Sequence, residues 1–274
     1  SVSRGLGDVY KRQHLVYAIA LIVGMGACAA SAKKQAEAKP DVWKSYNVGT
    51  VLFEDKASET KGSDIYHRII PDAESYIKEQ ARTVLATLYN SPEDSITPVN
   101  KIHYTLEDIE GISAKGGGNG DVTIFYSTRH IEKSFAENDT AKLFFETRGV
   151  LLHELTHAYQ LEPQGIGSYG TNRVFWAFIE GMADAVRVAN GGFDGPNARP
   201  KGGNYMDGYR TAGYFFVWLR DNKDPEFLRK FNRSTLEVVP WSFDGAIKHI
   251  LGNEYNIDEL WHEYQVAVGD IQAQ

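Results

Sequence analysis

The segment His153-Glu154-Leu155-Thr156-His157 constrains this chain more than any other feature, because it sets two histidines and a glutamate in the HExxH spacing. Residues four apart lie one turn apart on the same face of an α-helix, so both imidazoles can point at one ion. Glu154 lies about 100° around the helix from His153, where it can reach a water on that ion without joining the ligands. The spacing therefore predicts a metal site with a separate base, the arrangement that metal-assisted hydrolysis requires.

The surrounding residues predict that this motif lies on a long helix with one buried side. Asp139-Thr140 is a suitable start, because a short polar side chain can cap the first free N–H groups. A mostly apolar stripe then recurs at helical spacing: Leu143, Phe144, Thr147, Val150, Leu151, Leu155 and Ala158. Gly149 weakens the helix by about 1 kcal/mol relative to Ala. We expect the helix to end between Gln160 and Gly165, around Pro163.

A second helical stretch, about residues 171–190, carries the acidic pair Glu180 and Asp184 at i, i+4 spacing. A catalytic zinc ion needs a third protein ligand and an open fourth position. Glu180 follows His157 by 23 residues, enough for a turn and most of a returning helix, so we expect it to be that ligand. Asp184 is then placed to accept a hydrogen bond from the free ring nitrogen of a ligand histidine. The reverse assignment, with Asp184 as ligand and Glu180 behind it, remains open. We expect Arg187 to pair with a buried carboxylate.

Several stretches carry a resemblance to a known family: Gly149–Gln160, Glu180–Arg187, Gly208–Ala212, Phe215–Leu219, Phe227–Asn232 and Leu260–Tyr264. The HExxH…ExxxD pattern resembles the gluzincin arrangement of thermolysin-like metallopeptidases. More closely, about residues 51–268 resemble the basic secretory protein family of plant and bacterial zinc metallopeptidases. The resemblance implies an α+β, zincin-like domain. In it a small N-terminal sheet with its helix packs on a mainly helical C-terminal part, and one zinc ion is bound in the cleft.

The resemblance and the motif together imply a peptidase. We expect Glu154 to accept a proton from the attacking water and to deliver it to the leaving amine. The oxyanion needs a hydrogen-bond donor, and Tyr209 is the candidate because it lies in a family-like stretch; Tyr205 and Tyr214 are the alternatives. The expected partner is a protein or peptide substrate, including a glycoprotein. Two rival functions are an inactive zincin-like surface protein that binds peptides or glycans, and an interaction lipoprotein with an incidental motif.

The charge of the chain departs from the family name. The formal net charge is −7, whereas the family is named for basic members. We expect this difference to alter substrate choice or surface behaviour and to leave the metal chemistry unchanged. A net negative charge also argues against nucleic acid as a partner.

The amino-terminal residues predict export. Lys11 and Arg12 precede an apolar run over residues 15–30, which is the length of a signal-peptide core and short for a membrane span. Met25-Gly26-Ala27-Cys28 resembles a bacterial lipobox, in which Cys28 would be lipidated, and this is the only cysteine, so no intramolecular disulfide is possible. Ordinary cleavage near Ala30-Ser31-Ala32 is the alternative. Residues 1–12 do not match a signal sequence throughout and are excluded from fold reasoning.

We therefore expect residues 1–30 to be a signal segment, residues 31–40 a flexible tether and residues 41–274 a single zincin-like peptidase domain. The predicted location is the outer membrane or cell surface, otherwise the periplasm or the medium. Membrane contact is expected only through a lipid anchor at Cys28.

Periodicity predicts strands first and helices later. The expected strands are residues 48–53, 101–106 and 121–126, and the expected helices, besides the two above, are residues 72–90, 205–220, 225–231, 243–251 and 257–268. Glycines 116–118 and 120 lack the Lys-Ser/Thr of a phosphate-binding loop and predict a flexible hairpin connection. This order indicates an α+β fold. In the zincin folds that the chain resembles, the strand at residues 121–126 would line the cleft and offer an unpaired edge to substrate.

Overall fold

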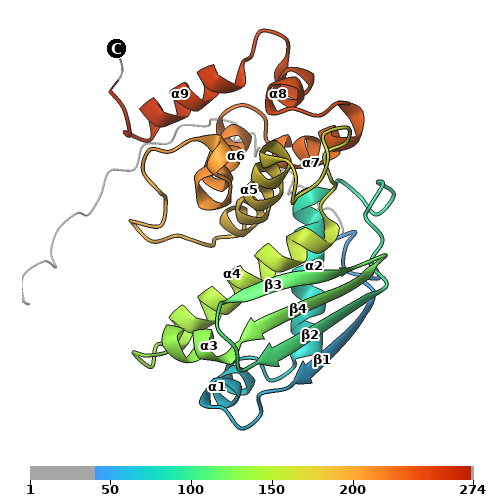
Figure 1. Ribbon diagram of the computed structural model, residues 1–274, viewed down its shortest axis with the longest axis vertical. Coiled ribbons are helices and arrows are strands. Elements are labelled where there is room, and N and C mark those ends of the chain that lie inside the picture. Colours follow the sequence, from blue (N-terminus) through green and yellow to red (C-terminus); the bar gives the residue numbers. More distant parts are fainter. Residues whose placement is uncertain (1–40, 273–274) are drawn as a thin grey trace, which may run out of the picture. The chain divides into compact units, whose positions relative to one another are not determined.

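The computed structural model describes residues 41–272, whose first part forms a four-stranded sheet and whose second part is helical (Figure 1). The strands are β1 (Thr50–Asp55), β2 (Lys101–Glu107), β3 (Ser113–Gly118) and β4 (Asp121–Ser127). In the described range the α-helices are α1 (Lys61–Ile69), α2 (Ala73–Leu88), α3 (Thr128–Ser134), α4 (Thr140–Tyr159), α5 (Arg173–Ala189), α6 (Tyr209–Asn222), α7 (Phe227–Glu237), α8 (Phe243–Leu251) and α9 (Ile257–Ala267).

The predicted α+β class is confirmed by this order of elements, although α1 and α3 were not expected. The expected signal segment, Cys28 and the tether at residues 31–40 lie outside the described residues. Within residues 41–272, no helix has the length and apolar character needed to cross a membrane.

The sheet is mixed and has the strand order β1-β2-β4-β3. Strands β1, β2 and β4 run parallel, and β3 pairs antiparallel with β4 at one edge. The parallel pairing of β1 with β2 requires a crossover connection, which α1 and α2 provide. The prediction that the strand at residues 121–126 has an unpaired edge was wrong, because β4 lies between β2 and β3. The strand at that edge of the sheet is β3. The sequence does not predict it as a strand, because half of its residues are glycine.

A tight turn joins β3 to β4. Asn119 and Gly120 have φ angles of 54° and 82°, as in the two-residue type I′ turns whose twist suits a hairpin. The glycines at 116–118, expected within a flexible connection, instead pair with β4. A Cβ atom on Gly117 would lie 2.0 Å from the carbonyl oxygen of Asp121, so the close approach of the two strands requires glycine there.

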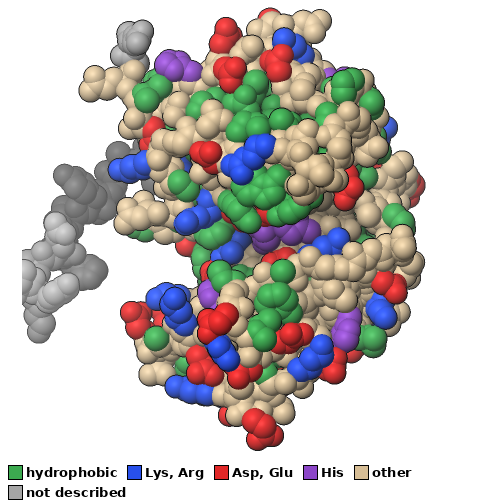
Figure 2. All heavy atoms as spheres, viewed as in Figure 1, with side chains coloured by type: hydrophobic (Ala, Val, Ile, Leu, Met, Phe, Trp, Pro, Cys, Tyr) green, Lys and Arg blue, Asp and Glu red, His purple; other side chains and the backbone are tan. Residues whose placement is uncertain are grey.

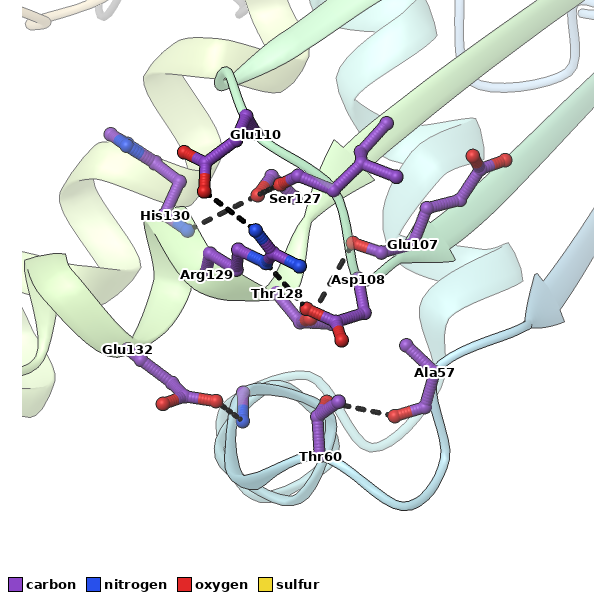
Figure 3. Close-up of polar contacts among 12 residues, drawn as sticks. Ala57, Thr60, Glu107, Asp108, Glu110, Ser127, Thr128, Arg129, His130 and Glu132 are labelled. Carbon is purple, nitrogen blue, oxygen red and sulfur yellow. Dashed lines mark hydrogen bonds and ion pairs between the residues drawn. The ribbon is translucent and has the colours of Figure 1, made fainter.

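The connection that leads from β2 into β3 is held at its base by the start of α3 (Figure 3). The Arg129 guanidinium donates to Asp108 Oδ1 at 2.7 Å and to Glu110 Oε1 at 2.6 Å, and Ser127 Oγ donates to the Ile109 carbonyl at 2.6 Å. Helix α1 joins the same region, since the backbone N–H of Gly62 donates to Glu132 on α3 at 2.9 Å. These contacts fix where β3 begins.

Helices α2 and α4 cover one face of the sheet (Figure 1). The predicted stripe of α2 is confirmed as core, because the following residues are all buried: Ala73, Ile77, Ala81, Val84, Leu85 and Leu88. Alternate residues of β2 and β4 point at the same core, including Ile102, Tyr104, Val122 and Ile124. Burial of this apolar surface holds α4 against the sheet, with β3 beside it.

Helices α5 and α6 pack closely because glycines lie where their backbones approach. A Cβ atom on Gly181 would lie 2.8 Å from the Cβ of Ala212, and one on Gly213 would lie 2.9 Å from the backbone nitrogen of Ala185. The helix predicted at residues 205–220 is divided at Gly208, whose φ is 66° and which separates the 3-10 helix η1 (Tyr205–Asp207) from α6. This packing fixes the position of the segment of α5 that contains Glu180 and Asp184 relative to α6.

Gly149, a weak point of α4 by propensity, is required by packing against α5. A Cβ atom there would lie 2.3 Å from Nε of Arg187. The guanidinium of Arg187 donates to Glu146 Oε2 at 2.6 Å and lies 3.8 Å from the centre of the Phe193 ring. The expectation that Arg187 pairs with a carboxylate is confirmed, although the buried partner is Arg187 and Glu146 is only half-buried. The pair ties α4 to α5 about two turns before His153.

We expect Gly149→Ala to destabilise the protein, although Ala is the better helix former. Propensity favours Ala by about 1 kcal/mol. Displacing Arg187 from Glu146 would leave a buried charge without its partner, which costs about 3–5 kcal/mol. The free energy of unfolding, measured by urea denaturation, should therefore fall by about 2–4 kcal/mol. The same substitution should cost much less in an Arg187→Met background, and a gain in stability in the wild-type background would contradict the packing argument.

Candidate metal centre

The candidate site lies where α4 and α5 meet. The Asp139 side chain caps α4 by accepting from the backbone N–H of Lys142, as the sequence predicts. Asn172 caps α5 by accepting from the backbone N–H groups of Val174 and Phe175. Helix α4 then presents His153 and His157 one turn apart, and α5 presents Glu180 toward them.

Three atoms that can bind a metal face one another in this site. Nε2 of His153 lies 3.1 Å from Nε2 of His157 and 3.4 Å from Oε2 of Glu180, and that oxygen lies 3.7 Å from Nε2 of His157. In a tetrahedral zinc site with bonds of about 2.0–2.1 Å, ligand atoms lie roughly 3.4 Å apart. Oε2 of Glu180 is also buried with no hydrogen-bond partner among the described residues, and a bound cation would satisfy it. The group therefore fits a metal ion.

Asp184 holds His153 from behind. Its Oδ1 accepts a hydrogen bond from Nδ1–H of His153 at 2.7 Å, so Nε2 is the ring nitrogen that faces His157 and Glu180. Burial alone would lower the pKa of His153, but hydrogen bonding to Asp184 and Glu180 and the charges of Asp184 and Glu154 outweigh it and raise the pKa to about 10. A metal ion would therefore bind at Nε2 by displacing a proton. Of the two assignments left open by the sequence, this geometry favours Glu180 as the ligand.

His157 has a partner that the sequence analysis missed. Nε2 of Gln160 lies 2.9 Å from Nδ1 of His157, while Oε1 of Gln160 is buried without a partner in the described structure. Turning the amide by 180° brings Oε1 to Nδ1–H as an acceptor, so that both groups are satisfied and Nε2 keeps its lone pair. Burial and the charge of His153 lower the pKa of His157 to about 3, so this imidazole is neutral, as a metal ligand must be. Gln160 lies three residues after His157, which is the spacing of helix neighbours.

Glu154 lines the same cavity and is 6% exposed. Burial raises the pKa of its carboxyl group, against the lowering effects of His153, the Ser113 hydroxyl and the backbone of Lys115. A carboxyl group with a raised pKa is better matched to proton transfer near neutrality. Because Ser113 and Lys115 belong to β3, the edge strand of the sheet borders the site.

Tyr209 is the tyrosine that lies beside the histidines. Its ring stacks on His153 with 6.0 Å between ring centres and an interplanar angle of 12°, and it lines the cavity. Its φ is 42°, a left-handed backbone conformation that is unusual for a residue with a side chain and that is enriched at functional sites. Burial, followed by the charges of Glu180 and Asp184, raises the pKa of the phenol, which keeps it protonated as a donor.

The two alternative tyrosines are occupied elsewhere. The hydroxyl of Tyr205 donates to Asp258 at 3.0 Å, and that of Tyr214 donates to the Phe193 carbonyl. Neither residue lines the cavity.

Tyr169 is a further cavity residue that the sequence analysis missed. Its hydroxyl donates to Oε1 of Glu180 at 2.5 Å, so one carboxylate oxygen of Glu180 is held while the other faces the histidines. Tyr169 lies in the connection between α4 and α5, where no periodic pattern indicates which side chain will fold over the site.

These groups share a cavity of about 360 Å³. Figure 2 shows histidine side chains at the bottom of a hollow, between a surface rich in hydrophobic side chains and one of mixed charge. Phe175 and Ile179 of α5 form an apolar part of its wall, Glu162 contributes a carboxylate, and Lys115 is the only Lys or Arg among the lining residues.

Comparisons with known proteins identify the family of this chain. A family model described as BSP, "Peptidase of plants and bacteria", matches residues 48–264, which include all the residues discussed in this section. No curated protein sequence and no solved structure matched the chain significantly.

Proposed function

Because this chain belongs to the BSP family, the peptidases of plants and bacteria, we propose that it is a zinc-dependent peptidase with a zincin-like fold. The observation that carries the proposal is the set of three ligand atoms, 3.1–3.7 Å apart, with Glu154 lining the same cavity. His153, His157 and Glu180 would hold one ion, and Asp184 and Gln160 would orient the two imidazoles. Two nitrogens and one oxygen form the ligand set of many catalytic zinc sites.

Zinc, when bound, supplies Lewis acidity that makes water a better nucleophile and polarises the substrate carbonyl. The remaining steps belong to the chain. Glu154 accepts a proton from the attacking water and delivers it to the nitrogen of the leaving amine, so that the peptide bond is replaced by a carboxylate and an amine. Its buried position and raised pKa suit both directions of that transfer.

Tyr209 would donate a hydrogen bond to the oxygen of the carbonyl as negative charge develops there. Its position against His153 places the phenol at the cavity, and among the described residues its hydroxyl has no short hydrogen bond comparable with those of Tyr205 and Tyr214. Tyr169 would hold Glu180 in its ligand orientation.

A substrate in extended form would lie along β3. This strand pairs with β4 on one side only, so its other edge is available for backbone hydrogen bonds to a peptide. Ser113 on this strand lines the cavity together with Glu154, so a peptide laid there would pass the proposed base. The signal pattern and the position of Cys28 further support export and attachment to a membrane by a lipid.

The test is metal-dependent cleavage of peptides. The purified chain should cleave a mixed peptide library, lose that activity after dialysis against a chelator, and regain it on addition of about one equivalent of zinc. Chelator-resistant cleavage would contradict the metal mechanism. A well-folded, zinc-loaded protein that cleaves no peptide would contradict the assignment as a peptidase.

A further inference from the structure

Lys115 occupies an unusual position in the cleft. It belongs to the edge strand β3 and lies opposite Ile124 of β4, which points into the core. Side chains of directly opposed residues in a sheet share a face, so the Lys115 side chain lies on the inner face, toward α4, and it lines the cavity with Glu154 and His157. It is half-buried there.

The ammonium of Lys115 forms no ion pair or hydrogen bond with any residue in the range 41–272. Lys56 shows the contrast, since its ammonium pairs with Glu107 at 3.3 Å and Glu54 at 3.9 Å. Two carboxylates of the cavity, Glu154 and Glu180, have other roles in the proposed mechanism. The third, Glu162, makes no ion pair with Lys115. A half-buried ammonium without a protein partner can accept an anionic group from a ligand.

The residues of β3 that follow Lys115 have no side chains with which to recognise a substrate. Gly116, Gly117 and Gly118 follow this lysine, so a peptide laid along β3 beyond Lys115 meets backbone only. Hydrogen bonds to the backbone of β3 can form with a peptide of any sequence, whereas contacts with side chains of the protein discriminate between peptide sequences. Lys115 is therefore the side chain of β3 that is best placed to discriminate between substrates.

We propose that Lys115 is a specificity-determining residue that binds a substrate carboxylate beside the scissile bond, so that the protein prefers acidic peptides. This inference rests on the proposed function and names the substrate class of the same site. The carboxylate belongs either to an Asp or Glu side chain or to the end of the peptide chain. A charge-assisted hydrogen bond at a half-buried position should favour an acidic peptide over its amide counterpart by about tenfold in kcat/KM.

The experiment compares cleavage profiles of a peptide library for the zinc-loaded full chain and its variants Lys115→Met, Lys115→Glu and Lys61→Met. Lys61 is an exposed lysine at the start of α1 that does not line the cavity, and it serves as the matched control. We expect the wild type and Lys61→Met to show Asp or Glu enriched at one position near the cut. Lys115→Met should lose that enrichment, and Lys115→Glu should favour Lys or Arg at the same position.

Matched peptides with free and amidated carboxyl ends identify the source of the carboxylate. If amidation abolishes the preference, Lys115 binds the carboxylate at the end of the peptide chain. If the preference is retained, Lys115 binds an Asp or Glu side chain. Either result supports carboxylate binding. An unchanged profile in Lys115→Met, or an equal fall for acidic and neutral peptides, would overturn the proposal while leaving the peptidase assignment intact. If the wild type cleaves no peptide at all, the proposed function fails and this inference fails with it.

Discussion

Replacing Glu154 by Gln should reduce kcat by about 10²–10⁴-fold, because the amide can neither accept the proton of the attacking water nor return it to the leaving amine. The substitution keeps the size of the side chain and removes only its basicity. Glu154 is buried in the cavity and is not among the three residues that converge as candidate ligands, so metal binding should survive. Activity is measured on any peptide that the wild type cleaves.

Metal content and stability serve as the controls for this variant. Zinc retention after desalting and the urea unfolding midpoint should both stay near wild-type values. A variant that keeps activity within tenfold of the wild type would remove Glu154 from the mechanism. A variant that loses its zinc would show instead that Glu154 supports the metal centre.

Replacing Glu180 by Ala should weaken zinc binding by more than about 10²-fold, beyond the 10–100-fold that is typical for loss of an outer partner of a ligand. Glu180 supplies the only oxygen of the three converging atoms, and its side chain is nearly inaccessible, so no solvent carboxylate can replace it. Affinity is measured by competition with a chromophoric chelator.

Two further variants test whether the loss of zinc affinity is specific to Glu180. Asp184→Asn keeps the shape of the residue behind His153 and should fall within the 10–100-fold range. Glu162→Gln removes a carboxylate that lines the same cavity but lies outside the converging group, and should leave zinc affinity near the wild-type value. Full zinc retention by Glu180→Ala, or an equal loss in Glu162→Gln, would contradict the proposed ligand set.

Local sequence signals account for the helices that carry the site. The cap at Asp139 predicts the first residue of α4, and the end predicted between Gln160 and Gly165 lies just beyond the last residue, Tyr159, because capping and periodicity are local properties. Phe144 is the member of the predicted buried stripe that is exposed instead. The i, i+4 pair Glu180 and Asp184 similarly indicates which face of α5 turns toward α4. The structure places the first beside both histidines and the second behind His153.

The features that could not be predicted depend on packing between distant segments. Strand β3 has no apolar alternation, since its glycines are required by the approach of β4 and not by any preference for strands. Propensity, which is a local property, makes Gly149 a weak point of α4, whereas the space beside it is filled by Arg187 from another helix. Tyr169 reaches Glu180 from an irregular connection, where spacing carries no information about direction.

The most direct test of the central claim is the position of the metal in a crystal of the zinc-loaded protein, determined from anomalous scattering at the zinc edge. The proposed site requires one peak within about 2.3 Å of Nε2 of His153, Nε2 of His157 and a carboxylate oxygen of Glu180. A peak bound by other residues, or no peak at this position in a crystal grown with excess zinc, would contradict it.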